Sequence, residues 1–124
     1  MNWAALGAIL CVPATCSLSA TLTKTAAPVA TVVTSDTVTV NVPPGNSGTL
    51  NFNSYSFSGT VVTTDYSKNG GAFTLVAEGS GIAFANGDTL AVRGTGMTAG
   101  ESWTFTLQDN TRQANIGTYT ITAS

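Results

Sequence analysis

The segment Asn86–Leu107 constrains the fold more than any other part of this chain of 124 residues. It holds two runs in which apolar and small polar residues alternate one by one. The alternation places on one face the residues Leu90, Val92, Trp103, Phe105 and Leu107. A period of two is typical of β-strands that bury one face, and the Gly-rich residues before and between the runs predict turns. We therefore expect two strands that share a core, with Trp103 buried in it.

Short strand-like runs recur along the rest of the chain, at residues 17–25, 29–34, 37–42, 49–57, 60–66, 72–78, 82–84 and 116–122. Between them the sequence predicts a turn at Ser35–Asp36, a hairpin loop at Ser67–Gly71 and a polar loop at 108–115. Many short strands separated by turn signals are typical of an all-β protein, and we expect an antiparallel β-sandwich.

The fourth of these runs changes phase along its length. Leu50 and Phe52 share one face, whereas Tyr55 and Phe57 fall on the opposite face. One inserted residue near Asn53–Ser54 would restore the register, so we expect a β-bulge there.

Charged side chains are few, with 4 Lys and Arg, 6 Asp and Glu, no His and a net charge of −2. They make up 8% of the chain, against roughly 25% in ordinary soluble proteins. This balance excludes a basic nucleic-acid groove, so we expect no nucleic-acid partner. A surface of Thr, Ser, Asn and Gly fits a protein packed against neighbours. It fits equally well the Thr- and Ser-rich β-domains of secreted and repeat-type proteins.

The first residues, Met1–Ala14, form the most apolar stretch of the chain. They are too few to span a membrane, which takes about 20 residues, so we expect no membrane partner. The stretch is similar to the apolar region of a signal peptide, but no Lys or Arg precedes it and Pro13–Thr15 before Cys16 makes a poor lipoprotein signal. We expect residues 1–25 to remain as an ordered apolar arm with a first strand, and residues 26–124 to form the sandwich domain.

The two cysteines, Cys11 and Cys16, lie five positions apart around Pro13. A disulfide between them would close a very small loop, and we favour free, buried thiols over a bridge. Two thiols without a His or a third Cys do not make a zinc site.

The acidic residues occur singly at predicted strand ends and turns: Asp36, Asp65, Glu78, Asp88, Glu101 and Asp109. Without His, acid–base catalysis would depend on these residues, but turn aspartates usually accept backbone amides instead. Asp88 and Glu101 could share a calcium ion between loops, although calcium takes about six or more oxygen ligands. No Gly-rich segment has the spacing of a phosphate-binding loop. We expect no catalytic residue, no cofactor and no metal site.

A sugar-binding site would use an aromatic platform, for which Tyr55, Tyr66 and Trp103 are the candidates. The alternation of Trp103 with Phe105 favours a place in the core for its ring. Tyr55 and Phe57, which are out of phase with their neighbours, are better candidates for an exposed apolar patch. Such a patch more often marks a protein contact than a sugar site.

Asn86–Leu107 resembles bacterial and bacteriophage immunoglobulin-like domains. Those domains often contain Gly-Asp, a short alternating strand, a Gly-rich loop and a second strand with a buried Trp. The matching residues here are Gly87–Asp88, Leu90–Val92, Gly94–Gly100 and Trp103, and the family's long stretch after the Trp strand is shorter in this chain. The resemblance implies an immunoglobulin-like β-sandwich with an adhesion, spacer or virion surface role, and such domains are rarely catalytic.

We therefore expect a non-enzymatic structural protein of a virion, a bacteriophage capsid decoration or tail component that contacts other virion proteins and forms a homo-oligomer. The alternative is a secreted or cell-surface module for adhesion or carbohydrate binding. The residues expected at the interface are Trp3, Leu6, Ile9, Leu10, Val12, Tyr55 and Phe57. Burying the apolar side chains of the arm contributes roughly 1.5–3 kcal/mol each before ordering costs, which is enough to anchor a subunit when symmetry repeats the contact.

Overall fold

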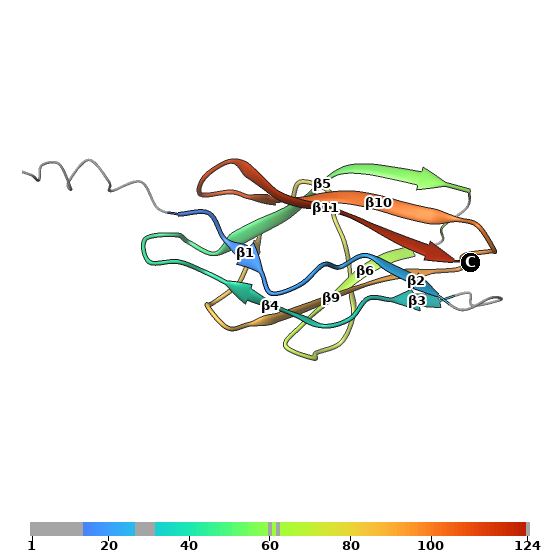
Figure 1. Cartoon of the computed structure of the whole chain (residues 1–124), viewed down its shortest axis with the longest axis horizontal. Helices are drawn as coiled ribbons and strands as arrows, with labels where there is room; N and C mark the ends of the chain where they lie inside the picture. Colours follow the sequence, from blue (N-terminus) through green and yellow to red (C-terminus); the bar gives the residue numbers. More distant parts are fainter. Residues whose placement is uncertain (1–13, 27–31, 60, 62, 124) are drawn as a thin grey trace, which may run out of the picture.

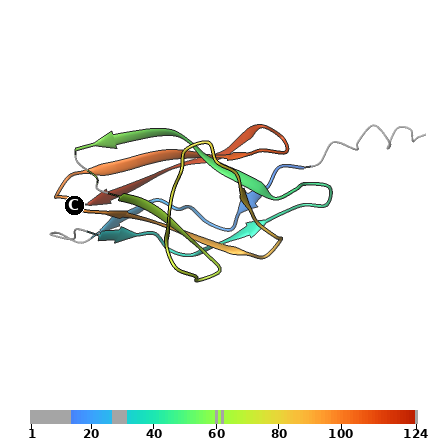
Figure 2. The same ribbon diagram turned by 180° about the vertical axis from the view of Figure 1, so that it is seen from behind.

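The structure, a computed structural model, describes residues 14–26, 32–59, 61 and 63–123, and the side chains of residues 26, 54 and 55 lie outside this description. Within these ranges the protein is all-β, with eleven strands in two sheets that lie face to face as a sandwich (Figure 1). Over the same residues, no helix is long and apolar enough to cross a membrane. The described chain begins at one end of the sandwich and finishes at the other (Figures 1 and 2).

The first sheet has six strands in the order β1-β4-β9-β6-β7, with β3 also paired to β9. Their bounds are β1 Ser17–Leu18, β3 Val32–Thr34, β4 Val38–Asn41, β6 Thr63–Lys68, β7 Thr74–Leu75 and β9 Thr89–Thr95. The second sheet has five strands in the order β2-β11-β10-β5-β8. Their bounds are β2 Lys24–Ala26, β5 Thr49–Ser58, β8 Ile82–Ala83, β10 Ser102–Asp109 and β11 Ala114–Ala123.

One strand pair departs from the antiparallel expectation. The run predicted at 17–25 is two short strands, because the chain leaves the first sheet after β1 and crosses to the second. There β2 runs parallel to the last strand, β11, with Lys24 opposite Ile121. The sandwich is therefore mixed, and a single early segment ties its two sheets together. Leu22, in the crossing, is fully buried.

The core lies between the sheets and contains the residues predicted for it. Leu90, Val92, Trp103, Phe105 and Leu107 are all fully buried. The aromatic rings contact one another, with 4.4 Å between the ring centres of Trp103 and Phe105. Phe105 in turn lies 5.2 Å from Phe52 and 5.8 Å from Tyr119.

Met97 also belongs to this core, but it lies outside the alternating runs of the sequence, so the pattern did not predict its burial. Its sulfur lies so close to Gly94 that a Cβ added there would meet it at 2.8 Å. The glycine of β9 therefore provides the space that the fully buried Met97 side chain occupies.

The bulge predicted in β5 is confirmed by the register of its pairing with β10. Thr104 and Thr106 are two residues apart on β10, but their partners on β5, Ser56 and Asn53, are three apart. The extra residue restores the alternation, so that Phe57 lies opposite the buried Trp103. Phe57 itself is 50% exposed and lies one residue before the end of β5.

The turn predicted at Ser35–Asp36 is wrong. β3 and β4 both pair with the same side of β9 and are separated by a bulge. At this bulge the Ser35 amide donates to Val92 O at 2.8 Å, and the Val92 amide donates to Ser35 Oγ at 2.9 Å. The serine hydroxyl thus replaces a backbone carbonyl in the ladder, and the chain continues without reversing.

Two further segments differ from expectation, and one loop agrees. The strand predicted at 72–78 shrinks to β7, where Leu75 points away from the core and Val76 packs against it. The loop predicted at 108–115 is a turn of residues 110–113, because β10 and β11 extend into it. The hairpin loop at 67–71 is confirmed by the positive φ angles of Asn69 (55°) and Gly70 (72°).

Candidate interaction surfaces

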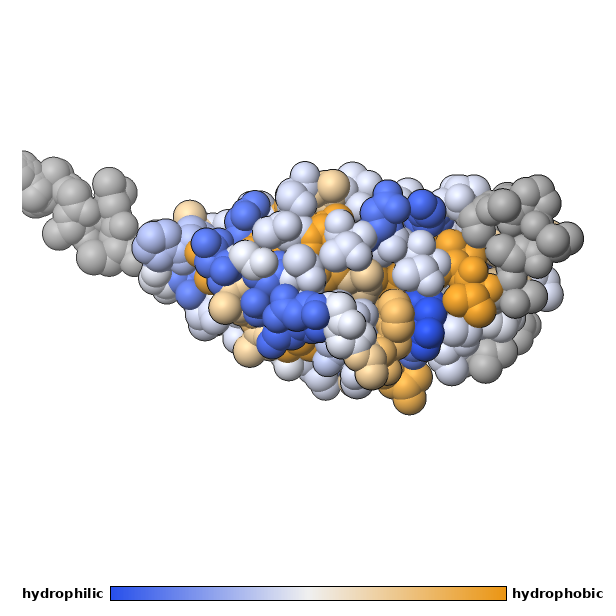
Figure 3. All heavy atoms as spheres, turned by 90° about the horizontal axis from the view of Figure 1, so that it is seen from below, coloured by the Kyte–Doolittle hydropathy of each residue, from blue (hydrophilic) through white to orange (hydrophobic). Residues whose placement is uncertain are grey.

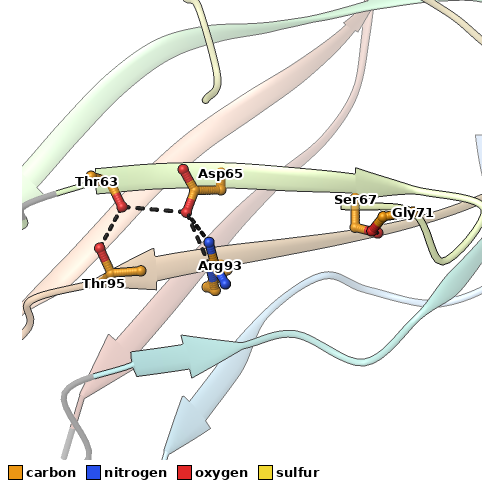
Figure 4. A network of polar contacts seen from close by, with 6 residues as sticks. All are labelled: Thr63, Asp65, Ser67, Gly71, Arg93 and Thr95. Carbon is orange, nitrogen blue, oxygen red and sulfur yellow. Dashed lines mark hydrogen bonds and ion pairs between the residues drawn. The ribbon is translucent and has the colours of Figure 1, made fainter. Parts of the chain in front are cut away.

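The outer face of the first sheet carries an ion pair between β6 and β9. Arg93 Nη2 and Nε donate to the same oxygen of Asp65, at 2.7 and 3.0 Å. Thr63 donates to this oxygen at 3.3 Å and also shares a hydrogen bond with Thr95, as Figure 4 shows. Asp65 is only 4% exposed, so its charge is compensated locally by these donors.

Apolar side chains flank this ion pair. The Phe73 ring lies over the Arg93 guanidinium, with 4.1 Å between the carbon of the cation and the ring centre. Val32 and Leu75 are 49% and 66% exposed on the same outer face. Figure 3 views the molecule from this side and shows hydrophobic residues in separate groups between hydrophilic ones. We call this surface the ion-pair face.

The outer face of the second sheet has a different chemistry, and we call it the threonine face. Because side chains alternate along each strand, the outward residues of β5, β10 and β11 follow from the buried ones. They include Asn51, Asn53, Ser56, Ser58, Ser102, Thr104, Thr106, Gln108, Thr118, Thr120 and Thr122. None of these eleven residues is charged. This face could not be predicted from the apolar side of each strand taken alone.

The side chains of the threonine face bond to one another across the strands. Thr104 pairs with Thr120 at 3.0 Å, and Thr106 pairs with Thr118 at 3.1 Å. In the next row Asn51 donates to Gln108 at 3.2 Å. The donors and acceptors of this face therefore find part of their hydrogen bonding within the face itself.

A buried carboxylate, Asp109, organises the end of the sandwich where the described chain begins. It is 0% exposed. One of its oxygens accepts the Cys16 amide and the Asn46 side-chain amide, each at 2.7 Å. Its other oxygen accepts the amides of Thr111 at 2.9 Å and Arg112 at 3.3 Å. Burial acts to raise the pKa of Asp109, but these hydrogen bonds outweigh it and hold the pKa below its usual range.

Cys16 belongs to the same cluster, as a free and buried thiol. Its Sγ donates to Asn46 Oδ1 at 3.3 Å, and Asn46 also donates to Ala14 O at 2.9 Å. Burial, together with the negative charge of Asp109, raises the pKa of the Cys16 thiol to about 11. The favoured free, buried thiol is thus confirmed for Cys16, and Cys11 lies outside the described residues.

Most of the side chains expected at the interface lie outside the described residues. Trp3, Leu6, Ile9, Leu10 and Val12, together with the side chain of Tyr55, lie outside the described residues. Phe57 is half-exposed, and its place in a protein contact stays a prediction. Of the candidate sugar platforms, Trp103 is fully buried and Tyr66 packs against the core.

The acidic residues within the described ranges act mainly on the backbone and on nearby cations. Asp88 accepts the Ala85 amide at 2.8 Å, and this hydrogen bond is the first cause of its lowered pKa. Glu101 accepts the Thr98 amide at 2.8 Å. Asp88 and Glu101 lie beyond opposite ends of β9, a strand of seven residues, which spans roughly 20 Å. They therefore cannot share one ion.

Neither a pocket nor a group of three or more metal-binding side chains occurs in the part of the chain that the structure describes. Comparison of the chain with family models, with curated proteins and with solved structures found no match. The immunoglobulin-like resemblance therefore stays a prediction, and the surfaces are interpreted from their own geometry.

Proposed function

We propose that this chain is a non-enzymatic structural protein of a virion, in which a β-sandwich body is attached to neighbouring subunits through its N-terminal arm. The observation that carries the proposal is the Asp109 cluster. Its hydrogen bonds to the Cys16 amide and, through Asn46, to Ala14 O fix the start of the described chain to the β10–β11 turn. An arm of residues 1–13 would then leave the body from a defined point, which a repeated symmetric contact requires.

We further infer that the body has immunoglobulin-like topology, and the strand order supports this inference. With β3 and β4 counted as one bulged strand, the first sheet follows the order A-B-E-D in β1, β4, β9 and β6. The second sheet follows G-F-C in β11, β10 and β5. The buried Trp103 lies on the strand that corresponds to F rather than C, which departs from the antibody pattern.

The alternative, a secreted or cell-surface adhesion or carbohydrate-binding module, has less support. Of its candidate aromatic platforms, Trp103 is buried in the core and Tyr66 packs against it, whereas the side chain of Tyr55 lies outside the described residues. A lipid anchor on Cys16 would need an accessible thiol, whereas this thiol is 2% exposed and bonded to Asn46.

The test uses particles purified from the organism that makes the chain, with mass spectrometry and immunogold labelling to locate the protein. The informative variant lacks residues 1–13. Deletion must stop before Ala14, because the Ala14 carbonyl and the Cys16 amide belong to the Asp109 cluster. We expect the truncated chain to have a β-type circular dichroism spectrum and to unfold cooperatively, but to be missing from the particle.

A second variant keeps the length of the arm and replaces Trp3, Leu6 and Ile9 with Ser, which separates the loss of apolar side chains from the loss of chain length. It should be folded and absent from particles as well, because the apolar side chains are the proposed anchor. An unfolded truncated chain would assign residues 1–13 to the core and overturn the arm. A truncated chain that still joins its particle would move the interface to the body, where Tyr55 and Phe57 are the next residues to substitute. A native mass that shows cleavage after a leader would favour the surface module.

A further inference from the structure

The two outer faces of the sandwich differ in charge. The uncharged one, the threonine face, has no role in the proposed function. The ion-pair face holds Asp65 and Arg93 side by side. The threonine face holds eleven outward residues and no charge. The nearest charged residues along the chain are Glu101, before β10, and Asp109, which ends β10 and is fully buried in the cluster with Cys16. Protein surfaces normally carry interspersed charges that oppose association, and these eleven positions carry none.

The hydrogen bonds within the threonine face lower the cost of covering it. A buried hydroxyl or amide destabilises an interface mainly when it loses water without gaining a partner. Here Thr104 pairs with Thr120, and Thr106 pairs with Thr118. Thr106 is already only 9% exposed. A second surface can therefore lie on these rows while the hydroxyls keep their partners.

Charge also limits what that second surface can be. A partner that brought Lys, Arg, Asp or Glu onto this face would bury a charge with no counter-charge to meet it, which is unfavourable. A suitable partner surface is uncharged and offers rows of small side chains like those of a sheet. A second copy of the threonine face meets both conditions, and a twofold axis brings two identical faces together. Sheets packed in this way lie about 10 Å apart.

We propose that the threonine face is a self-association surface, through which two copies of this chain pack sheet on sheet about a twofold axis. The inference deepens the proposed function, because it names one contact of the homo-oligomer, and it is separate from the arm. None of the eleven residues that define the face is aromatic, and a saccharide is the alternative occupant that the experiment distinguishes.

The experiment is sedimentation equilibrium of the full chain over a wide range of concentration. We expect a monomer–dimer equilibrium. Thr118→Glu places a carboxylate at an exposed position of the threonine face. It should weaken dimerisation roughly a hundredfold or more, as expected for an unpaired charge at an interface. Thr118→Lys should weaken it similarly, because the cost comes from burying either charge, and Thr118→Ser should have little effect.

The matched control is Thr34→Glu. Thr34 is also an exposed strand threonine, but it lies on the ion-pair face, opposite Arg93. It should leave dimerisation unchanged. Circular dichroism and the unfolding midpoint of each variant show whether it is folded, and Thr120→Glu provides a second site if Thr118→Glu is not.

Three results would overturn the self-association surface. They are a chain that stays monomeric at all concentrations, a dimer that tolerates charge at both Thr118 and Thr120, and a dimer that Thr34→Glu weakens equally. A monomer whose binding to immobilised polysaccharide depends on Thr118 would assign the face to a saccharide instead. Failure of the virion proposal has a different signature, namely a dimer sensitive to Thr118→Glu in a protein that no particle contains.

Discussion

Among the described residues Trp103 is the largest fully buried side chain, and its ring contacts both Phe52 and Phe105. Removing it leaves a cavity that the surrounding rings can fill only in part. We expect Trp103→Ala to lower the free energy of unfolding by roughly 3–5 kcal/mol, which chemical denaturation can measure. Leu75→Ala is the control, because Leu75 is mostly exposed and its loss should cost less than about 0.5 kcal/mol. A Trp103→Ala loss as small as that of the control would contradict the burial.

Asp109 makes stability depend on pH in a direction that follows from its hydrogen bonds. Its pKa is lower in the folded protein than the ordinary value of about 3.9. The unfolded chain therefore binds the proton first as the pH falls. The stabilising contribution is fully present above about pH 5 and is lost as the pH falls through the folded pKa.

Asp109→Asn tests this dependence. The side-chain amide of this variant presents its own N–H group to some of the groups that donate hydrogen bonds to the carboxylate. We therefore expect the free energy of unfolding to fall by roughly 1.5–3 kcal/mol at neutral pH. The variant should also lose less of its stability between pH 5 and pH 2 than the wild type. Asp36→Asn is the control, since Asp36 is exposed and paired with Lys24 at the surface. Equal pH profiles for wild type and Asp109→Asn would show that Asp109 is not the group that titrates.

At the scale of elements, the ion pair between β6 and β9 is the clearest electrostatic link. Arg93→Met leaves the carboxylate of Asp65 buried without its main donor. Breaking a buried pair costs roughly 3–5 kcal/mol, and the cost here should be smaller because the Arg93 side chain is 31% exposed. Replacing both residues, as Asp65→Val with Arg93→Met, should restore part of the loss, because no unpaired charge remains.

A double-mutant cycle measures this coupling directly. We expect a coupling energy of roughly 1–3 kcal/mol for Asp65 and Arg93. The exposed pair of Lys24 and Asp36 should give less than about 1 kcal/mol. If the two pairs gave the same coupling energy, the ion pair would be a surface feature without a structural role.

At the scale of the whole molecule, Cys16 lies where the first sheet meets the end of the second. Its amide bonds to Asp109 of β10, while the next residue begins β1. Both burial and the raised pKa keep the thiol from forming the reactive thiolate. In the chain without residues 1–13, where Cys16 is the remaining cysteine, we expect alkylation at pH 8 to follow global unfolding. Labelling that is fast in native buffer and independent of urea would show that this end opens locally.

The sequence by itself determined which residues face the core, because the direction of a side chain in a strand depends on its position along that strand. Trp103, Phe105 and Leu107 followed from their alternation, and the β5 bulge followed from a break in it. The place of Ser35 inside a bulged strand did not follow from the sequence, because its hydroxyl is an acceptor in the ladder only when β9 lies beside it. The strand predicted at 72–78 was too long for a similar reason, since the length of β7 is set by its pairing with β6 at two positions.

Tertiary structure alone decided which strands are neighbours, and every candidate surface depends on that choice. Asp65 meets Arg93 across 28 positions, and Asp109 meets Cys16 across 93. Alternation contains no information about the order of strands in a sheet, so neither pair could be predicted. The threonine face arises in the same way. Each polar residue was visible as the outward half of an alternating run, but only the pairing of β5, β10 and β11 places them on one uncharged surface.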